Sequence, residues 1–195
     1  MKSSNNTRIG TIQKLLKRSY TGTEKDLNGY AIDKDLSGKR VQVYKDKTGD
    51  DAFVVHRGTQ SPKDLATDLY YAFGGDLKNT DRYKQAEKIQ KEAEMKYGAK
   101  NITTVGHSLG SMLGSAVGKD SKQIISYNKG ISPFDAFKKQ PKNEINIKTE
   151  LDPVSALLRK DDKTIVIPSR TLDPFKEHGL DALSRLNPRK TIGGF

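Results

Sequence analysis

One serine between two glycines, in the segment Gly106–Gly110 (Gly-His-Ser-Leu-Gly), constrains the fold of this chain more than any other feature. A run rich in β-branched residues (101–105) precedes the segment, and a run of small residues with helical spacing (111–118) follows it. Glycines two residues before and after a serine leave room for the backbone to turn sharply. The pattern therefore predicts a strand, a tight turn that exposes Ser108 in a strained conformation, and a helix.

The composition indicates one globular domain with a modest core. Of the 195 residues, 33% are hydrophobic and 30% are charged. No apolar run approaches the length of a membrane span, and residues 1–6 lack the apolar stretch of a secretory signal. The chain has no cysteine, which excludes disulfides and thiolate ligands, and its three histidines argue against a histidine-rich metal site.

The formal net charge of +11 has two interpretations. It could attract anionic lipid, nucleic acid or another polyanion. We favour the second, a lysine-rich solvated surface, because the lysines alternate with acidic residues along the chain.

Residues 8–20 predict a basic amphipathic helix, which could lie on a membrane but more often packs across its own domain. No recognisable nucleic-acid-binding module is present, so nucleic acid is not favoured as a partner.

The order of elements predicts an α/β fold, with a mostly parallel sheet flanked by helices. One domain is expected over 1–195, with a helical segment at 1–27 and a flexible tail at 187–195. Glycines at four-residue spacing should bring the helix after the serine very close to the sheet. The expected strands are 30–33, 39–45, 51–56, 101–105, 123–127, 144–149 and 164–168, and the expected helices are 8–20, 61–73, 80–97, 111–118 and 179–186.

A nucleophilic serine needs a base and an acid that orients this base. The turn around Ser108 resembles the nucleophile elbow of α/β-hydrolases, in which the chain order is nucleophile, acid, histidine. If the chain is such a hydrolase, His178 is the base, because it is the one histidine after Ser108. Asp152 is the favoured acid because it directly follows the strand at 144–149, and groups at strand carboxyl ends gather at the site of such sheets. Asp173 is the second choice. The other acidic residues in the interval are Asp120, Asp135, Glu144, Glu150, Asp161 and Asp162.

The negative charge that develops during such a reaction needs two hydrogen-bond donors. One is the backbone N–H of Leu109, at the positive end of the following helix. The other should come from the turn at 56–59, where Thr59 offers an N–H and a hydroxyl. A plain strand-to-helix turn explains these residues equally well.

Together these segments resemble the class 3 lipases, the fungal-lipase-like branch of the α/β-hydrolases. The family has an Arg-Gly-Ser/Thr turn and, nine residues later, an aspartate that supports the hydroxyl; Thr59 and Asp68 have this spacing. The resemblance extends over 41–186, and compact lysine-rich relatives without cysteine are familiar from viruses. The matching stretches are 53–59, Asp68, 105–110, 151–154 and 178–181.

Two features of the chain depart from the family. Leu65 stands where many members have a tryptophan, and the short interval from Asp152 to His178 leaves little room for a large acyl pocket. Residues 69–75 form an aromatic segment followed by glycines, which is equally consistent with a lid over lipid or with core.

The resemblance implies ester hydrolysis through an acyl-enzyme, without a metal or an organic cofactor. The expected substrate is a lipid or small ester, chiefly a phospholipid or acylglycerol, with transient contact to an anionic membrane surface. The alternative is a catalytically idle hydrolase-fold protein that serves as a structural or polyanion-binding component. A complete set of nucleophile, base and acid argues against this alternative. A cytoplasmic or virion-associated location is expected over classical secretion.

Overall fold

Seven strands form one mixed sheet, in the order β2-β3-β4-β5-β6-β7-β8. Strands β2, β3 and β4 pair antiparallel, and β4 to β8 pair in parallel. The computed structural model describes residues 7–27, 29–60, 77–131, 138–158, 161–187, 189 and 191–192. The expected fold class, a mostly parallel sheet flanked by helices, is confirmed.

The observed strands of the sheet begin and end within two residues of the expected positions. The helix expected at 61–73, Leu65, Asp68 and the lid candidate at 69–75 lie outside the described residues. The strands are β1 Thr7–Arg8, β2 Tyr30–Ile32, β3 Val41–Asp46, β4 Ala52–His56, β5 Ile102–His107, β6 Gln123–Tyr127, β7 Glu144–Thr149, β8 Thr164–Ile167 and β9 Thr191–Ile192. The helices are α1 Ile9–Thr21, α3 Asp81–Tyr97, α4 Leu109–Val117 and α5 Pro174–His178, with 3₁₀ turns η1 Leu77–Asn79, η2 Ala99–Asn101 and η3 Leu180–Arg185.

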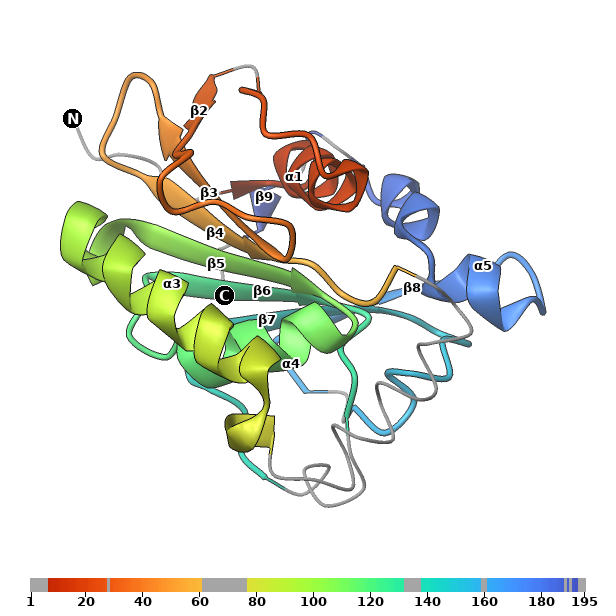
Figure 1. The fold of residues 1–195 in the computed structure, drawn as a ribbon. Coiled ribbons are helices and arrows are strands. Elements are labelled where there is room, and N and C mark those ends of the chain that lie inside the picture. The colour runs from red at the N-terminus through yellow and green to blue at the C-terminus, as the bar shows by residue number, and fades with distance from the viewer. Residues whose placement is uncertain are drawn as a thin grey trace.

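α1 covers one face of the sheet and α3 and α4 cover the other (Figure 1). A hydrophobic cluster lies on each side. Side chains alternate between the faces of a strand, so Phe53 and Val55 of β4 pack with α1 while Ala52 and Val54 pack with α3. α1 buries Ile9, Ile12, Leu15 and Leu16 against the sheet and therefore packs across its own domain, as favoured from the sequence. Of the helices described, none combines the length and hydrophobicity needed to cross a bilayer.

α4 lies very close to β4 and β5. A Cβ atom at Gly110 would collide with the carbonyl oxygen of His56, and one at Gly118 would come within 2.7 Å of Thr104 Oγ1. The glycine spacing seen in the sequence thus reflects close packing of this helix against the sheet. This packing fixes the position of the turn that precedes α4.

A two-residue strand, β9, lies within the segment expected to be a flexible tail. β9 pairs antiparallel with β1, with Thr7 opposite Ile192. Ile192 is 1% exposed and joins the cluster that contains α1. Within the segment expected to be a tail, Thr191 and Ile192 therefore form a strand with one buried apolar side chain, and the flexibility of 187–195 stays a prediction.

Candidate active site

Ser108 occupies the turn between β5 and α4 in a conformation that few side chains adopt, with φ 57° and ψ −126°. Glycine at position 106 permits this turn, because a Cβ there would lie 2.6 Å from the Gly110 carbonyl oxygen. Ser108 is 1% exposed, so the solvent exposure expected from the sequence is wrong for this structure. Its Oγ is buried and has no hydrogen-bond partner among the described residues.

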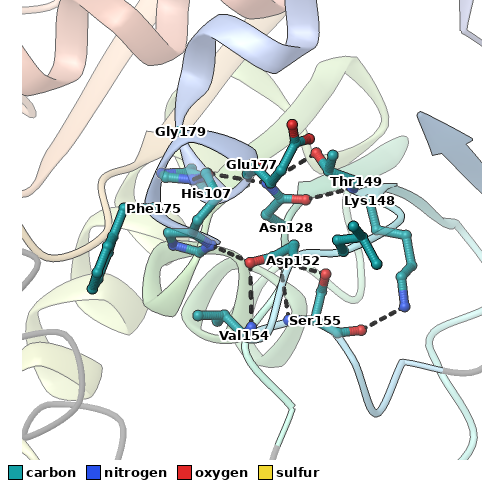
Figure 2. A network of polar contacts seen from close by, with 12 residues as sticks. His107, Asn128, Lys148, Thr149, Asp152, Val154, Ser155, Phe175, Glu177 and Gly179 are labelled. Carbon is teal, nitrogen blue, oxygen red and sulfur yellow. Dashed lines mark hydrogen bonds and ion pairs between the residues drawn. The ribbon is translucent and has the colours of Figure 1, made fainter. Parts of the chain in front are cut away.

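Asp152 and His178 form a hydrogen-bonded pair, with Asp152 Oδ1 2.8 Å from His178 Nδ1. Asp152 is 1% exposed and lies in the turn after β7. It also accepts bonds from the Val154 and Ser155 amides and from Ser155 Oγ, which Figure 2 shows around the labelled Asp152. Burial raises the pKa of Asp152, but the hydrogen bond and charge of His178, the Ser155 hydroxyl and the Val154 amide outweigh burial and lower that pKa below its usual value.

The competing acids lie in other environments. Asp173 caps α5, where it accepts bonds from the Phe175 and Lys176 amides. Asp161 closes a turn by accepting from the Lys163 amide and Thr164 Oγ1. Among the carboxylates that the structure describes, Asp152 is the one that bonds His178.

Asn128 holds the backbone that carries His178. This residue follows β6 with φ 44° and donates from Nδ2 to the carbonyls of Glu177, at 3.1 Å, and His178, at 3.0 Å. Its Oδ1 accepts the Thr149 amide at 2.8 Å, and these residues lie together in Figure 2. Asn128 thus joins the ends of β6 and β7 to the histidine segment. The sequence analysis missed it, and its position directly after a predicted parallel strand was the available signal.

Glu177 anchors the same segment from the other side. It is fully buried, and Arg185 donates to both of its oxygens, at 2.6 and 3.0 Å. The Arg170 and Thr171 amides also donate to Glu177 Oε1. These bonds lower the pKa of Glu177 to about 2, and those from Arg185 have the largest effect. The sequence analysis missed both α5 and this pair; an acidic residue directly before the candidate histidine was the only local signal.

The two proposed donors for a developing negative charge lie on segments that meet. Leu109 is the first residue of α4, and the first amides of a helix have no acceptor within it. The turn after β4 packs on the serine turn, since a Cβ at Gly58 would lie 3.0 Å from Ser108 Cβ. Thr59 follows Gly58 and is half-buried. Asp68 lies outside the described residues, so its support of Thr59 stays a prediction.

The other two histidines are buried and differ in surroundings. Burial and the nearby His178 lower the pKa of His107 to about 3. His56 faces Gln90 on the α3 side of the sheet, and burial lowers its pKa to about 4. Among the described residues, no group of three or more histidine or carboxylate side chains could hold a metal ion.

Three comparisons relate this chain to known proteins. A family model described as "Phospholipase-like: Tle-like phospholipase domain" matches residues 13–127, which is more than half of the chain. No curated protein sequence matches it. The Rhizomucor miehei lipase in its propeptide complex is 13% identical, with a TM-score of 0.51 over 75% of this chain and 61% of that chain. This likeness agrees with the α/β fold.

Two further solved structures are similar over most of this chain. The Lip2 lipase from Yarrowia lipolytica is 14% identical, with a TM-score of 0.49 over 83% of this chain and 80% of that chain. A triacylglycerol lipase from Penicillium expansum is 16% identical, with a TM-score of 0.47 over 83% of this chain and 77% of that chain.

Proposed function

Because this chain belongs to the Tle-like phospholipase domain family, we propose that it is a serine ester hydrolase acting on lipid esters. The observation that carries the proposal is the Asp152–His178 pair at the carboxyl end of a sheet whose strained turn presents Ser108. In this proposal Ser108 is the nucleophile, His178 the general base and Asp152 the acid that orients it.

The first half of the reaction transfers the acyl group to Ser108. His178 Nδ1 is occupied by Asp152, so Nε2 takes the proton from Ser108 Oγ as this oxygen attacks the ester carbonyl carbon. The carbonyl oxygen becomes negatively charged and is held by the Leu109 and Thr59 amides. His178 then returns the proton to the leaving alcohol, and the bond between the acyl carbon and the alcohol oxygen breaks.

The second half repeats these steps with water. His178 Nε2 takes a proton from water, the hydroxide oxygen attacks the acyl carbon, and the proton returns to Ser108 Oγ as the carboxylic acid leaves. Asp152 stays ionised throughout, since its pKa is lowered, and it stabilises the positive charge that His178 acquires in both halves.

Exposed apolar side chains near the pair support a lipid ester as the substrate. Leu172 is 90% exposed and Phe175 61% exposed, and both lie within six residues of His178. Leu151, next to Asp152, is 49% exposed. Such side chains favour contact with an apolar surface, and the net charge of +11 favours an anionic one. We therefore propose phospholipid or acylglycerol esters presented at a membrane surface.

A fluorophosphonate probe tests the nucleophile directly. We expect the folded wild type to be labelled covalently at Ser108 and the Ser108→Ala variant to remain unlabelled. Ester hydrolysis by this variant should fall by about 10³-fold or more, because the attacking oxygen is gone.

Circular dichroism of both proteins provides the folding control. If the probe does not label the folded wild type, the proposed enzymatic function is refuted. The alternative is then an idle hydrolase fold with a structural or polyanion-binding role. If labelling occurs, the ratio of kcat/KM between long-chain and short-chain esters separates a lipase from an esterase.

A further inference from the structure

Tyr20, in the last turn of α1, makes a polar contact with the serine turn. Its hydroxyl oxygen lies 2.7 Å from His107 Nδ1 and accepts the Gly58 amide at 3.1 Å. The Tyr20 ring also meets the His107 ring edge-on, with 5.6 Å between centroids. A helix on one face of the sheet therefore contacts two of the turns that form the candidate site.

His107 continues this contact to the histidine segment. Its Nε2 lies 3.0 Å from the His178 carbonyl oxygen, and the two imidazole rings are 4.9 Å apart. A carbonyl oxygen can only accept, so Nε2 of His107 carries the proton. Because burial lowers the pKa of His107 to about 3, the ring is neutral near pH 7 and its Nδ1 is an acceptor.

These constraints fix the direction of every bond. Burial raises the pKa of Tyr20 to about 12, so its hydroxyl keeps its proton and donates it to His107 Nδ1. The Tyr20 oxygen is then free to accept from Gly58. The resulting relay runs from the Gly58 N–H to the Tyr20 O–H, then to the His107 ring, and ends on the His178 carbonyl.

Each end of the relay lies beside, or on, a residue with a proposed role. Gly58 precedes Thr59, His107 precedes Ser108, and the last acceptor belongs to His178 itself. The hydrogen bonds of the relay involve neither Ser108 Oγ nor the ring nitrogens of His178. The relay can therefore act only by fixing the distances between the donor turn, the nucleophile turn and the base.

We propose that Tyr20 is a positioning residue for the hydrolysis proposed above, on which this inference rests. Its hydroxyl sets the relative placement of Thr59, Ser108 and His178 through the relay. Small misplacements of reacting groups cost rate far more than binding, and a shift of about 1 Å can cost about 10²-fold. A residue that only attached α1 to the sheet would not have this effect.

The Tyr20→Phe variant tests the proposal, because it keeps the ring and removes the hydroxyl. We expect kcat on a soluble short-chain ester to fall about 10- to 100-fold while KM changes less than twofold. The rate constant for fluorophosphonate labelling should fall in parallel. All rates are measured at a temperature where every variant is fully folded.

Tyr44→Phe is the matched control. Tyr44 is also a buried tyrosine, in the cluster that packs on α1, and its hydroxyl donates to Gln42 Oε1 at 2.9 Å. This variant removes one hydrogen bond of a buried hydroxyl, whereas Tyr20→Phe removes two, and it should keep the kcat of the wild type. Proton NMR of the His178 Nδ1–H adds a readout that is independent of turnover; its signal should move in Tyr20→Phe and not in Tyr44→Phe.

Three results would overturn the proposal. Folded Tyr20→Phe with wild-type kcat and an unmoved His178 signal removes the positioning role. Equal losses of kcat in Tyr20→Phe and Tyr44→Phe assign the effect to general destabilisation. A folded wild type that is not labelled refutes the proposed function itself, and this result is distinct because it does not involve either tyrosine variant.

Discussion

Strand β7 has a buried carboxylate at each end, and the two have different partners. Glu144 is its first residue, and Asp152 follows three residues after its last. Each is 1% exposed, and each lies 2.8 Å from a nitrogen, Lys129 Nζ for Glu144 and His178 Nδ1 for Asp152. By burial and pairing alone the two carboxylates are alike.

The two ends differ in the groups around each carboxylate, although β7 also carries Asn146, whose buried Oδ1 has no hydrogen-bond partner among the described residues. At the Glu144 end, Ser115, Ser126 and Lys129 all donate to the carboxylate, and Lys129 also donates to Ser115 and Gln140. At the Asp152 end, Ser108 Oγ is buried without a hydrogen-bond partner among the described residues. A satisfied buried network rigidifies a protein. A buried serine hydroxyl without a partner, on a turn that the His107–His178 hydrogen bond joins to the histidine segment, is a candidate reactive group.

Replacing each carboxylate by its amide should separate the two ends most strongly. Asp152→Asn removes the charge that orients His178 and stabilises its protonated form, so kcat/KM should fall about 10⁴-fold. Glu144→Gln should change kcat/KM less than threefold at a temperature where the variant is folded. Steady-state ester hydrolysis measures both. Equal losses in the two variants would mean that the comparison does not distinguish a catalytic from a structural carboxylate.

The free energy of unfolding should respond in the opposite order, with the larger loss in Glu144→Gln. Glu144→Gln removes the carboxylate that pairs with the Lys129 ammonium, which is 6% exposed, and breaking a buried pair in this way costs about 3–5 kcal/mol. The double variant Glu144→Gln, Lys129→Met removes both charges and should recover much of that loss. Urea unfolding gives the free energies. A double variant that is less stable than Glu144→Gln would contradict the account of Glu144 as half of a buried ion pair.

The sequence was sufficient to distinguish the two ends of β7 by position. Strand periodicity predicted β7 at 144–149, and the rule that functional groups gather at strand carboxyl ends favoured Asp152 over Glu144. His178 followed by elimination, since it is the one histidine after the serine. Local patterns suffice for such inferences because strands and turns depend largely on neighbouring residues. The catalytic roles of these residues remain predictions.

The residues that support the site could not be predicted, because their partners are far apart in the chain. Tyr20 and His107 are 87 residues apart, and Asn128 and His178 are 50 apart. Only the folded sheet brings such groups together, and no local period indicates which pairs will meet. Glu177 had a signal, its place beside His178, but the short helix α5 was not foreseen. The strands and turns are therefore easier to predict from this sequence than the long-range contacts that support the site.

The Glu177–Arg185 pair, at the Asp152 end, is a third pair with a buried carboxylate to compare with the other two. Acid unfolding should show a smaller effect for this pair. Arg185 is 16% exposed, so water reaches it more easily than it reaches Lys129. Glu177→Gln should therefore lower the free energy of unfolding less than Glu144→Gln does. The pKa of Glu177 lies at about 2, below its usual 4.5. A lowered carboxylate pKa stabilises the fold fully above the unfolded value, and this contribution is lost as the pH falls through the folded value.

The difference in melting temperature between wild type and Glu177→Gln should therefore be constant above about pH 5 and shrink toward pH 2. Thermal unfolding at pH values from 7 to 2 measures it. Arg185→Met is the matched variant, because it removes the same pair but leaves Glu177 to titrate, so its own stability should fall less steeply with acid than that of the wild type. If the gap between wild type and Glu177→Gln stayed unchanged down to pH 2, the ion pair would not be what stabilises the segment that carries His178. Asn128 and the His107 relay would then be its main anchors, and the Tyr20 variant would be the stronger test of how this end of the sheet is held in place.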